Sequence, residues 1–263
     1  MTPSESSSPD TPPTNLPTGL GLRELLNQVH EALRHAFPAS RREWVRAEVV
    51  RVGQLRSGHL SLELAEHDDS GKLLAKADAW LWRNRAEAVQ RRFLEATGGE
   101  LRAGIKILAQ AGLSYRPDKN LALIVDDIDP AFTIGDMEAR LAAIREKLRA
   151  DGVLEANRRL PAPAEFCKVA VVSPANAAGL GDFRQGADAL AAHGLCTFSY
   201  YPAPFQGEQV ADGLLAVLRQ VYRDHRQERF DALALIRGGG GKADLYDLNV
   251  HAIANALCRM PPP

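Results

Sequence analysis

The spacing of hydrophobic residues changes several times along the chain, and each change marks a different kind of structure. Residues 1–19 are rich in Ser, Pro and Thr and hold almost no large apolar side chains, which predicts a disordered tail. Leu and Val then recur at helical spacing in LGLRELLNQVHEALRHAF, up to Pro38. This spacing predicts a helix over 20–36.

From Trp44 onward, apolar and polar residues alternate as they do in half-buried strands. Three strands are predicted from EWVRAEVVRV, GHLSLELAE and LLAKADAWLW. A helical stretch, NRAEAVQRRFLEATG, follows, and a hairpin is predicted from GIKILAQAGLSYRP and NLALIVDDIDP. Five short strands with one helix after the third favour a Greek-key barrel of the OB type, although another small β domain would show similar strands.

The pattern after this barrel indicates a connector and then an α/β unit. A charged helix is predicted over 136–158, with an Asp-Gly break inside it and Pro161 after it. Strands and helices then alternate, with strands in CKVAVVSP, LCTFSYYPA and DALALIRGGGG and helices near 179–192, in EQVADGLLAVLRQVYRDH and in ADLYDLNVHAIANALCR. Continuous apolar strands alternating with helices predict a doubly wound parallel sheet.

The chain is therefore expected to fold as an OB-type barrel followed by a doubly wound, incomplete α/β domain. The predicted parts are a tail over 1–19, a helix with the barrel over 20–130, a connector over 131–160 and the α/β domain over 161–263.

Composition excludes several classes of protein. No apolar run reaches the 18 residues of a membrane span, and the N-terminus lacks the pattern of a signal peptide. The three cysteines are far apart, which argues against a disulfide framework and favours a reducing, cytoplasmic setting. No metal-ligand cluster is visible, so the sequence leaves open whether a divalent metal such as Mg²⁺ is used. The net charge is −1, so any nucleic-acid binding must depend on local clusters.

The segment LALIRGGGGKADLYDLN places an arginine at the end of a predicted strand and four glycines directly after it. Glycines allow backbone N–H groups to approach an anion, and Arg237 supplies a charged fork suited to phosphate. The first α/β strand also ends in a polar residue, Ser173, and ligands of such sheets lie beyond the carboxyl ends of the strands. We therefore expect an anion site here, although a flexible turn with an exposed arginine would have a similar sequence.

The glycine segment fits neither of two common nucleotide-binding motifs. A dinucleotide fingerprint follows the first strand of its unit, whereas these glycines follow the third. A P-loop requires Ser or Thr after its lysine, whereas Ala243 follows Lys242.

At this point the chain resembles a known family, the large subunit of exodeoxyribonuclease VII. The resemblance is carried, in order, by WVRAEV, SGHLSLEL, DAWLWR, VVSPANAAGLGDF, YPAPFQG and IRGGGGKADLYDLN. It implies an OB-type domain that binds single-stranded DNA and a catalytic domain that degrades single-stranded DNA from its ends. It also implies a small subunit as partner.

The resemblance assigns roles to individual residues. It implies that Asp182 and Arg237 are catalytic, consistent with a carboxylate that orients water and an arginine that stabilises phosphoryl charge. From the resemblance and the strand ends together, we expect phosphate or substrate contacts from Gly238, Gly239, Gly240, Asp244, Asn249 and Ser173. In the barrel, the candidate DNA-binding residues are His59, Trp82, Arg83 and Tyr115. Without the resemblance, Asp182 would be an ordinary acid near a helix start, and core packing would be the default role of the tryptophans.

The chain departs from the family pattern in two respects. The family continues to a GHxxD motif with an essential histidine and to a helical region that binds the small subunit, and neither occurs in these 263 residues. His193 and His251 are expected to be surface or satisfied histidines. In the barrel, Ser61 and Leu62 stand where the family tends to place aromatics. Residues 41–130 contain 15 Lys and Arg and 14 Asp and Glu, so this region is nearly neutral. Its densest basic cluster is Arg83, Arg85, Arg91 and Arg92.

Three functions remain open at the level of sequence. The first is a large-subunit homologue of exodeoxyribonuclease VII, as a fragment, a truncated form or an inactive divergent member. The second is a non-catalytic protein that binds single-stranded DNA. The third is an α/β enzyme that binds a nucleotide or sugar phosphate and shares only the glycine loop.

Overall fold

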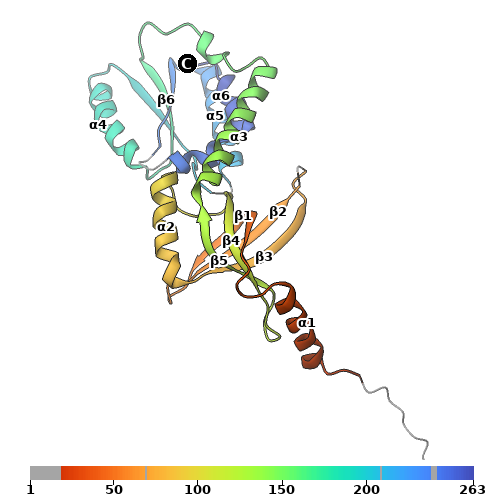
Figure 1. Cartoon of the computed structure of the whole chain (residues 1–263). Helices are drawn as coiled ribbons and strands as arrows, with labels where there is room; N and C mark the ends of the chain where they lie inside the picture. The colour runs from red at the N-terminus through yellow and green to blue at the C-terminus, as the bar shows by residue number, and fades with distance from the viewer. Residues whose placement is uncertain (1–18, 69, 208, 238–241) are drawn as a thin grey trace, which may run out of the picture.

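The computed structural model describes residues 19–68, 70–207, 209–237 and 242–263. The predicted N-terminal tail and the glycines at 238–241 thus lie outside the described residues, apart from Gly19 at the end of the tail. Figure 1 shows a β-barrel in the lower half of the view and an α/β unit above it, joined by a long helix.

The predicted barrel is confirmed. It is closed by five strands in the order β1-β2-β3-β5-β4, and helix α2 (Arg83–Thr97) follows the third strand as expected for an OB fold. The strands are β1 (Glu43–Gln54), β2 (Leu60–His67), β3 (Leu73–Leu81), β4 (Lys106–Ser114) and β5 (Ala122–Asp129).

Alternation along the strands fills the barrel interior. In β2, Leu60, Leu62 and Leu64 are buried at 2% exposure or less, whereas the residues between them are only partly buried. Helix α2 packs Phe93 into the same apolar cluster. Successive side chains of a strand point to opposite faces, so the period-two pattern of the sequence becomes one buried face.

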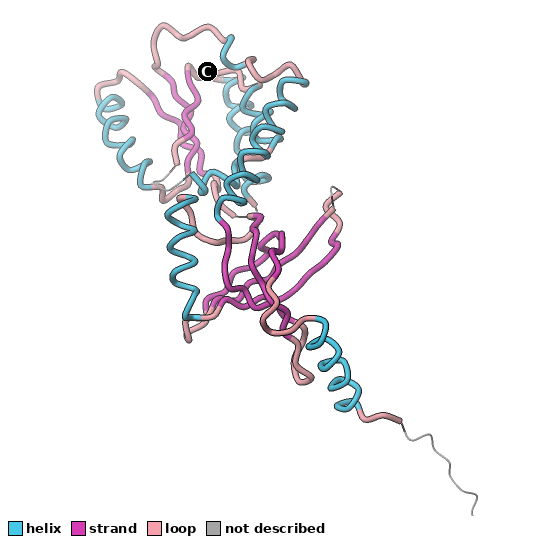
Figure 2. Tube along the Cα trace, viewed as in Figure 1, coloured by secondary structure: helices cyan, strands magenta, loops and turns pink. Residues whose placement is uncertain are grey.

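Helix α1 (Leu22–Ala36) precedes the barrel and buries none of its residues. Figure 2 shows it projecting from the barrel at the end opposite the α/β unit.

The connector helix differs from its prediction at both ends. Helix α3 spans Pro130–Ala150, rather than 136–158, and a short 3-10 turn at Asn157–Arg159 follows separately. It starts early because Asp129, the last residue of β5, caps it by accepting a hydrogen bond from the Ala131 N–H at 2.9 Å, with proline in the first helical position. It ends at the Asp-Gly break because Gly152 adopts a φ of 68°.

The α/β unit contains a parallel sheet of three strands in the described part of the chain, in the order β7-β6-β8. These strands are β6 (Lys168–Ser173), β7 (Thr197–Pro202) and β8 (Ala232–Leu235), and the helices are α4 (Ala178–Ala192), α5 (Val210–Gln227) and α6 (His251–Cys258). Figure 1 shows α4 on one side of the sheet and α5 and α6 on the other.

The central strand β6 explains why both faces of the sheet are covered. Val169 and Val171 pack with Leu180 of α4, whereas Ala170 and Val172 belong to the cluster that contains α5 and α6. Because successive residues of β6 point to opposite faces and these four are all apolar, the strand packs against helices on both sides. This is the arrangement that the sequence predicted for a doubly wound sheet.

One predicted helix is broken in the structure. The segment ADLYDLNVHAIANALCR was expected to form a single helix, but it forms a 3-10 helix, η2 (Lys242–Leu248), and then α6. Val250 between them is extended, with φ −120° and ψ 127°. Tyr246 of η2 packs into the apolar cluster of the barrel, whereas Ile253 of α6 packs against the sheet, so one straight helix could not serve both contacts.

Candidate nucleic-acid interface and phosphate site

The strands that carry the two polar ends lie next to each other. Strands β6 and β8 pair in parallel, so Ser173 and Arg237 come at the same carboxyl edge of the sheet. The Ile236 N–H still donates to the Val172 carbonyl oxygen at 2.9 Å, which keeps the ladder intact to the residue before Arg237. Ser173 is only 3% exposed, and its hydroxyl donates to the Pro174 carbonyl oxygen at 3.2 Å.

The start of α4 packs directly on the backbone of Arg237. A Cβ atom added at Gly179 would lie 2.5 Å from the Arg237 carbonyl oxygen, which is far inside van der Waals contact. Gly179, the first glycine of AAGLGDF, therefore allows the helix start and the end of β8 to meet. The structure thereby brings two separate sequence motifs to one place, as expected for a doubly wound sheet.

The other residues predicted for this site occupy different positions. Asp182 is exposed on α4, about one turn after Gly179. The backbone carbonyl of Asn249 accepts a hydrogen bond from Arg140 Nε at 3.0 Å. Asp244 belongs to η2, but the structure does not describe its side chain. Gly238, Gly239 and Gly240 lie outside the described residues.

Two of the tryptophans are not core residues. Trp44 is 49% exposed and Trp82 is 45% exposed, so the default expectation of core packing is wrong for both. Trp82 directly precedes α2 and is extended, with φ −70° and ψ 146°. An indole held at the surface offers a flat apolar face to a ligand.

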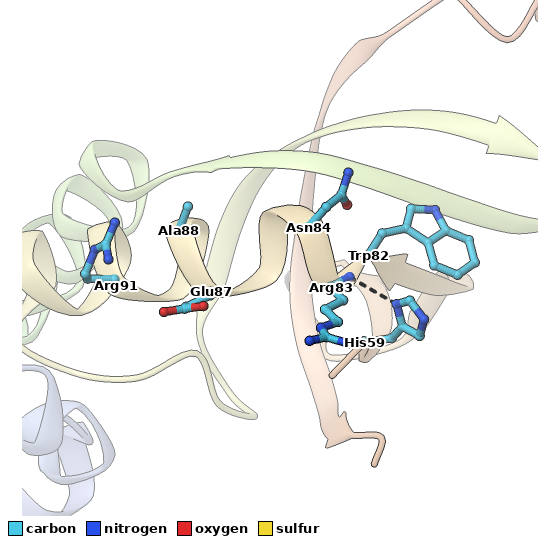
Figure 3. Close-up of a pocket in the computed structure, with 7 residues that line it drawn as sticks. All are labelled: His59, Trp82, Arg83, Asn84, Glu87, Ala88 and Arg91. Atoms are coloured by element: carbon cyan, nitrogen blue, oxygen red, sulfur yellow. Dashed lines mark hydrogen bonds between the residues drawn. The ribbon is translucent and has the colours of Figure 1, made fainter. Parts of the chain in front are cut away.

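Trp82 lines a surface pocket of about 620 Å³ on the barrel, which Figure 3 shows. The pocket contains three of the four residues predicted to bind DNA, and its full lining is His59, Trp82, Arg83, Asn84, Glu87, Ala88 and Arg91. The His59 ring lies edge-on to Trp82, with ring centroids 4.9 Å apart at 89°.

The SGH segment builds this pocket through its backbone. Gly58 has a φ of 83° and donates to the Leu55 carbonyl oxygen at 2.9 Å, closing the turn between β1 and β2. His59 Nδ1 then accepts the backbone N–H of Arg83 at 3.0 Å. This bond leaves Nε2 as the protonated nitrogen of a neutral imidazole. The hairpin turn and the start of α2 are thus locked together.

The basic cluster on α2 divides into two pairs. Arg85 and Arg92 turn toward the acidic residues of β5, with Arg85 Nε 3.8 Å from Asp126 and Arg92 paired with Asp127. Arg83 and Arg91 line the pocket instead. Only the second pair is positioned to attract an anion at this surface.

Tyr115 does not belong to the pocket lining. It lies beside α1, where its carbonyl oxygen accepts a hydrogen bond from His30 Nδ1 at 2.9 Å and its ring is 6.2 Å from that of His30.

His193 and His251 were expected to be surface or satisfied histidines, and the structure confirms this. His193 Nδ1 donates to the Ala189 carbonyl oxygen, and His251 Nε2 lies 3.1 Å from Asp151.

The sequence reasoning missed a set of residues at the junction of the two units: Arg102, Arg140, Tyr246 and Asp247. Tyr246 and Asp247 lie between the expected contact residues of the DLYDLN segment, and no local pattern separated them from ordinary helix positions.

The described residues contain no group of three His, Cys, Asp or Glu side chains arranged to hold a metal ion. Nor do they include a helix long and apolar enough to span a bilayer.

The fold and these surfaces define a class: an OB-fold barrel joined to an α/β domain. Comparison with known proteins agrees, since residues 20–129 match the OB-fold nucleic acid binding domain and residues 153–263 match the family described as exonuclease VII, large subunit.

Relatives give the same result. The exodeoxyribonuclease 7 large subunit of Deinococcus radiodurans is 38% identical over 98% of this chain, and that of Pseudomonas fluorescens strain SBW25 is 30% identical over 81%. The chain belongs to the exodeoxyribonuclease VII large-subunit family. It spans 62% of the first relative's length, and the match to the second covers 42% of that protein.

Proposed function

We propose that this chain binds single-stranded DNA and serves in its degradation from the ends by phosphodiester hydrolysis. The observation that carries the proposal is the contact between Gly179 and the Arg237 backbone, which brings the AAGLGDF and IRGGGG motifs together at one edge of the sheet. Family membership supports the same reaction.

In this proposal the phosphate of a DNA end lies beyond the carboxyl ends of β6 and β8. The Arg237 guanidinium stabilises negative charge on the phosphoryl oxygens. The N-terminus of α4 adds backbone N–H groups that have no partner within the helix. Asp182, exposed on the same helix, orients the attacking water or accepts its proton. Ser173, Gly238, Gly239, Gly240, Asp244 and Asn249 shape the loop around the phosphate.

The barrel holds the strand by its bases. Trp82 stacks on an unpaired base, and Arg83 and Arg91 attract the neighbouring phosphates. Stacking contributes about 1–3 kcal/mol per base and tolerates any sequence, which suits an enzyme that degrades single strands without sequence preference.

The 263 residues contain no GHxxD motif. We therefore expect them to bind DNA ends but to cleave them poorly. By the same family relationship, the small subunit of exodeoxyribonuclease VII is the proposed partner.

The phosphate site is tested by end binding. Affinities are measured by fluorescence anisotropy for oligonucleotides with a terminal phosphate at either end, for the same strands with hydroxyl ends, and for a circular strand. Arg237→Ala is expected to remove the preference for a phosphorylated end, at a cost of about 1.5–3 kcal/mol for a charged hydrogen bond. It should leave binding of the circle unchanged.

Arg229→Ala is the matched control, because Arg229 is exposed near the opposite edge of the sheet, before β8. Equal affinity of wild type for phosphorylated and hydroxyl ends would remove the case for a phosphate site. Binding of single strands through the barrel would then favour the second candidate, a non-catalytic binding protein.

A further inference from the structure

The junction between the barrel and the α/β unit is built around η2, the segment that follows the glycines. Tyr246 of η2 is 5% exposed and belongs to the barrel's apolar cluster, together with Leu101 and Ile105. A residue from the α/β unit thus completes the core of the other unit. In Figure 1 the short blue helix lies between the barrel and the sheet.

Asp247, the next residue, joins three segments of the chain. Its two carboxylate oxygens accept hydrogen bonds from Arg102 Nη1 at 2.7 and 2.6 Å, and Oδ2 also accepts the Gly207 N–H at 2.9 Å. Arg102 lies in the barrel, between α2 and β4, and Gly207 lies in the loop after β7. The pair is largely buried, with side-chain exposures of 25% and 13%.

Arg140 of α3 holds the same segment from the other side. Its guanidinium lies 4.8 Å from the centroid of the Tyr246 ring, and Nη1 donates to the Tyr246 hydroxyl at 3.0 Å. Nε donates to the Asn249 carbonyl oxygen at 3.0 Å. Burial raises the pKa of the Tyr246 hydroxyl, so the group that Arg140 contacts is a neutral phenol at neutral pH.

These contacts hold η2 between the barrel and the sheet. Lys242, the first residue of η2, comes five positions after Arg237 in the sequence. The loop after β7 is tied to the same carboxylate. Through Asp247, η2 and the loop after β7 are therefore both tied to Arg102 of the barrel.

We propose that Asp247 and Arg102 are a positioning pair, through which the barrel holds η2 and the loop after β7 beside the proposed phosphate site. The inference rests on the proposed phosphate site and adds to it the residues that set its geometry. Burying an ion pair contributes little net stability, since apolar residues of similar size often serve as well. What the contact of Arg102 Nη1 with both carboxylate oxygens adds is a defined orientation of Asp247.

The test uses the 263-residue chain with Asp247→Asn and Arg102→Ala. Amide hydrogen exchange in 242–249 should become at least about tenfold faster, while exchange in β1 to β5 stays unchanged. The preference for a phosphorylated DNA end should fall at least fivefold, and binding of a circular strand should not. Arg102→Lys, which keeps one charged nitrogen for Asp247, should restore most of the preference.

Asp126→Asn is the control. Asp126 is a barrel carboxylate of similar exposure, 15%, that pairs with Arg42 and Arg85 instead. It should change neither measurement. If Asp247→Asn proves unfolded by circular dichroism, Arg102→Gln takes its place, because it removes the charge that pairs with Asp247 and leaves Asp247 itself unchanged.

Two results would overturn the proposal: unchanged exchange in 242–249, or faster exchange with an intact preference for phosphorylated ends. The second would mean that the pair only stabilises the junction. Failure of the proposed function looks different, because wild type itself would then show no preference for a phosphorylated end.

Discussion

Trp82 shows how the surroundings of one side chain change its interpretation. An indole in a strand-rich sequence is most simply placed in the core, yet Trp82 is 45% exposed and lies edge-on to His59. The Arg83 N–H bond to His59 Nδ1 holds this arrangement in place. Trp82 therefore has a ring contact on one side and remains accessible to a ligand.

Trp82→Ala is expected to weaken binding of a short single-stranded oligonucleotide by about 1–3 kcal/mol, because one base loses its stacking face. Trp44→Ala is the matched control, since Trp44 is 49% exposed on β1 but does not line the pocket. Titration by fluorescence anisotropy gives both affinities. An equal loss in the two variants would show that the pocket is not the binding surface.

At the scale of elements, α4 and η2 place the candidate phosphate site. Helix α4 approaches β8 closely because Gly179 has no Cβ, and η2 is bent away from α6 because Tyr246 is buried in the barrel. Neither feature is a property of the element alone, because each depends on the surface against which it packs.

Helix α5 contains a pH-sensitive contact at its C-terminal end. His225 Nδ1 accepts the Phe230 N–H at 3.1 Å, and burial, together with nearby Arg229, lowers the pKa of His225 below its ordinary value. The folded-state pKa is thus below the unfolded one. The stabilisation is complete above the unfolded pKa of about 6.5 and is lost as the pH falls through the folded value.

His225→Gln is therefore expected to reduce the loss of stability on going from neutral pH to about pH 5. Urea unfolding at both pH values measures it. His35→Gln serves as control, because His35 is exposed on α1. Identical acid sensitivity of wild type and His225→Gln would contradict the assignment.

At the scale of the whole molecule, charge sets how DNA binding depends on salt. The net charge is −1, and the basic residues proposed to meet phosphates are few: Arg83, Arg91 and Arg237. Several other arginines of the barrel are paired with carboxylates, as Arg92 is with Asp127. Binding should therefore depend on a small number of phosphate contacts.

We expect single strands to bind more tightly than duplex, because stacking on Trp82 requires an unpaired base. With three phosphate contacts, log K should fall with log salt at a slope of about −2. Arg83→Gln should make this slope shallower by about 0.7. Anisotropy titrations across a salt series test both statements, and stronger binding of duplex would contradict the first.

The sequence alone determined most of the elements and the order of the two units. Period-two alternation predicted the barrel strands, and continuous apolar runs alternating with helices predicted the parallel sheet, because burial on one or two faces leaves its pattern in the residues themselves. Strand order at the edge also followed from sequence, since β6 and β8 pair as expected.

Only the tertiary structure decided which side chains act together. The pairing of Arg102 with Asp247 joins residues 145 positions apart, and the burial of Tyr246 in the barrel breaks a segment whose own pattern is helical. The division of the α2 arginines between β5 and the pocket likewise depends on the barrel's closure. These contacts have no local periodicity, because they arise where one unit packs against another and not along any single element.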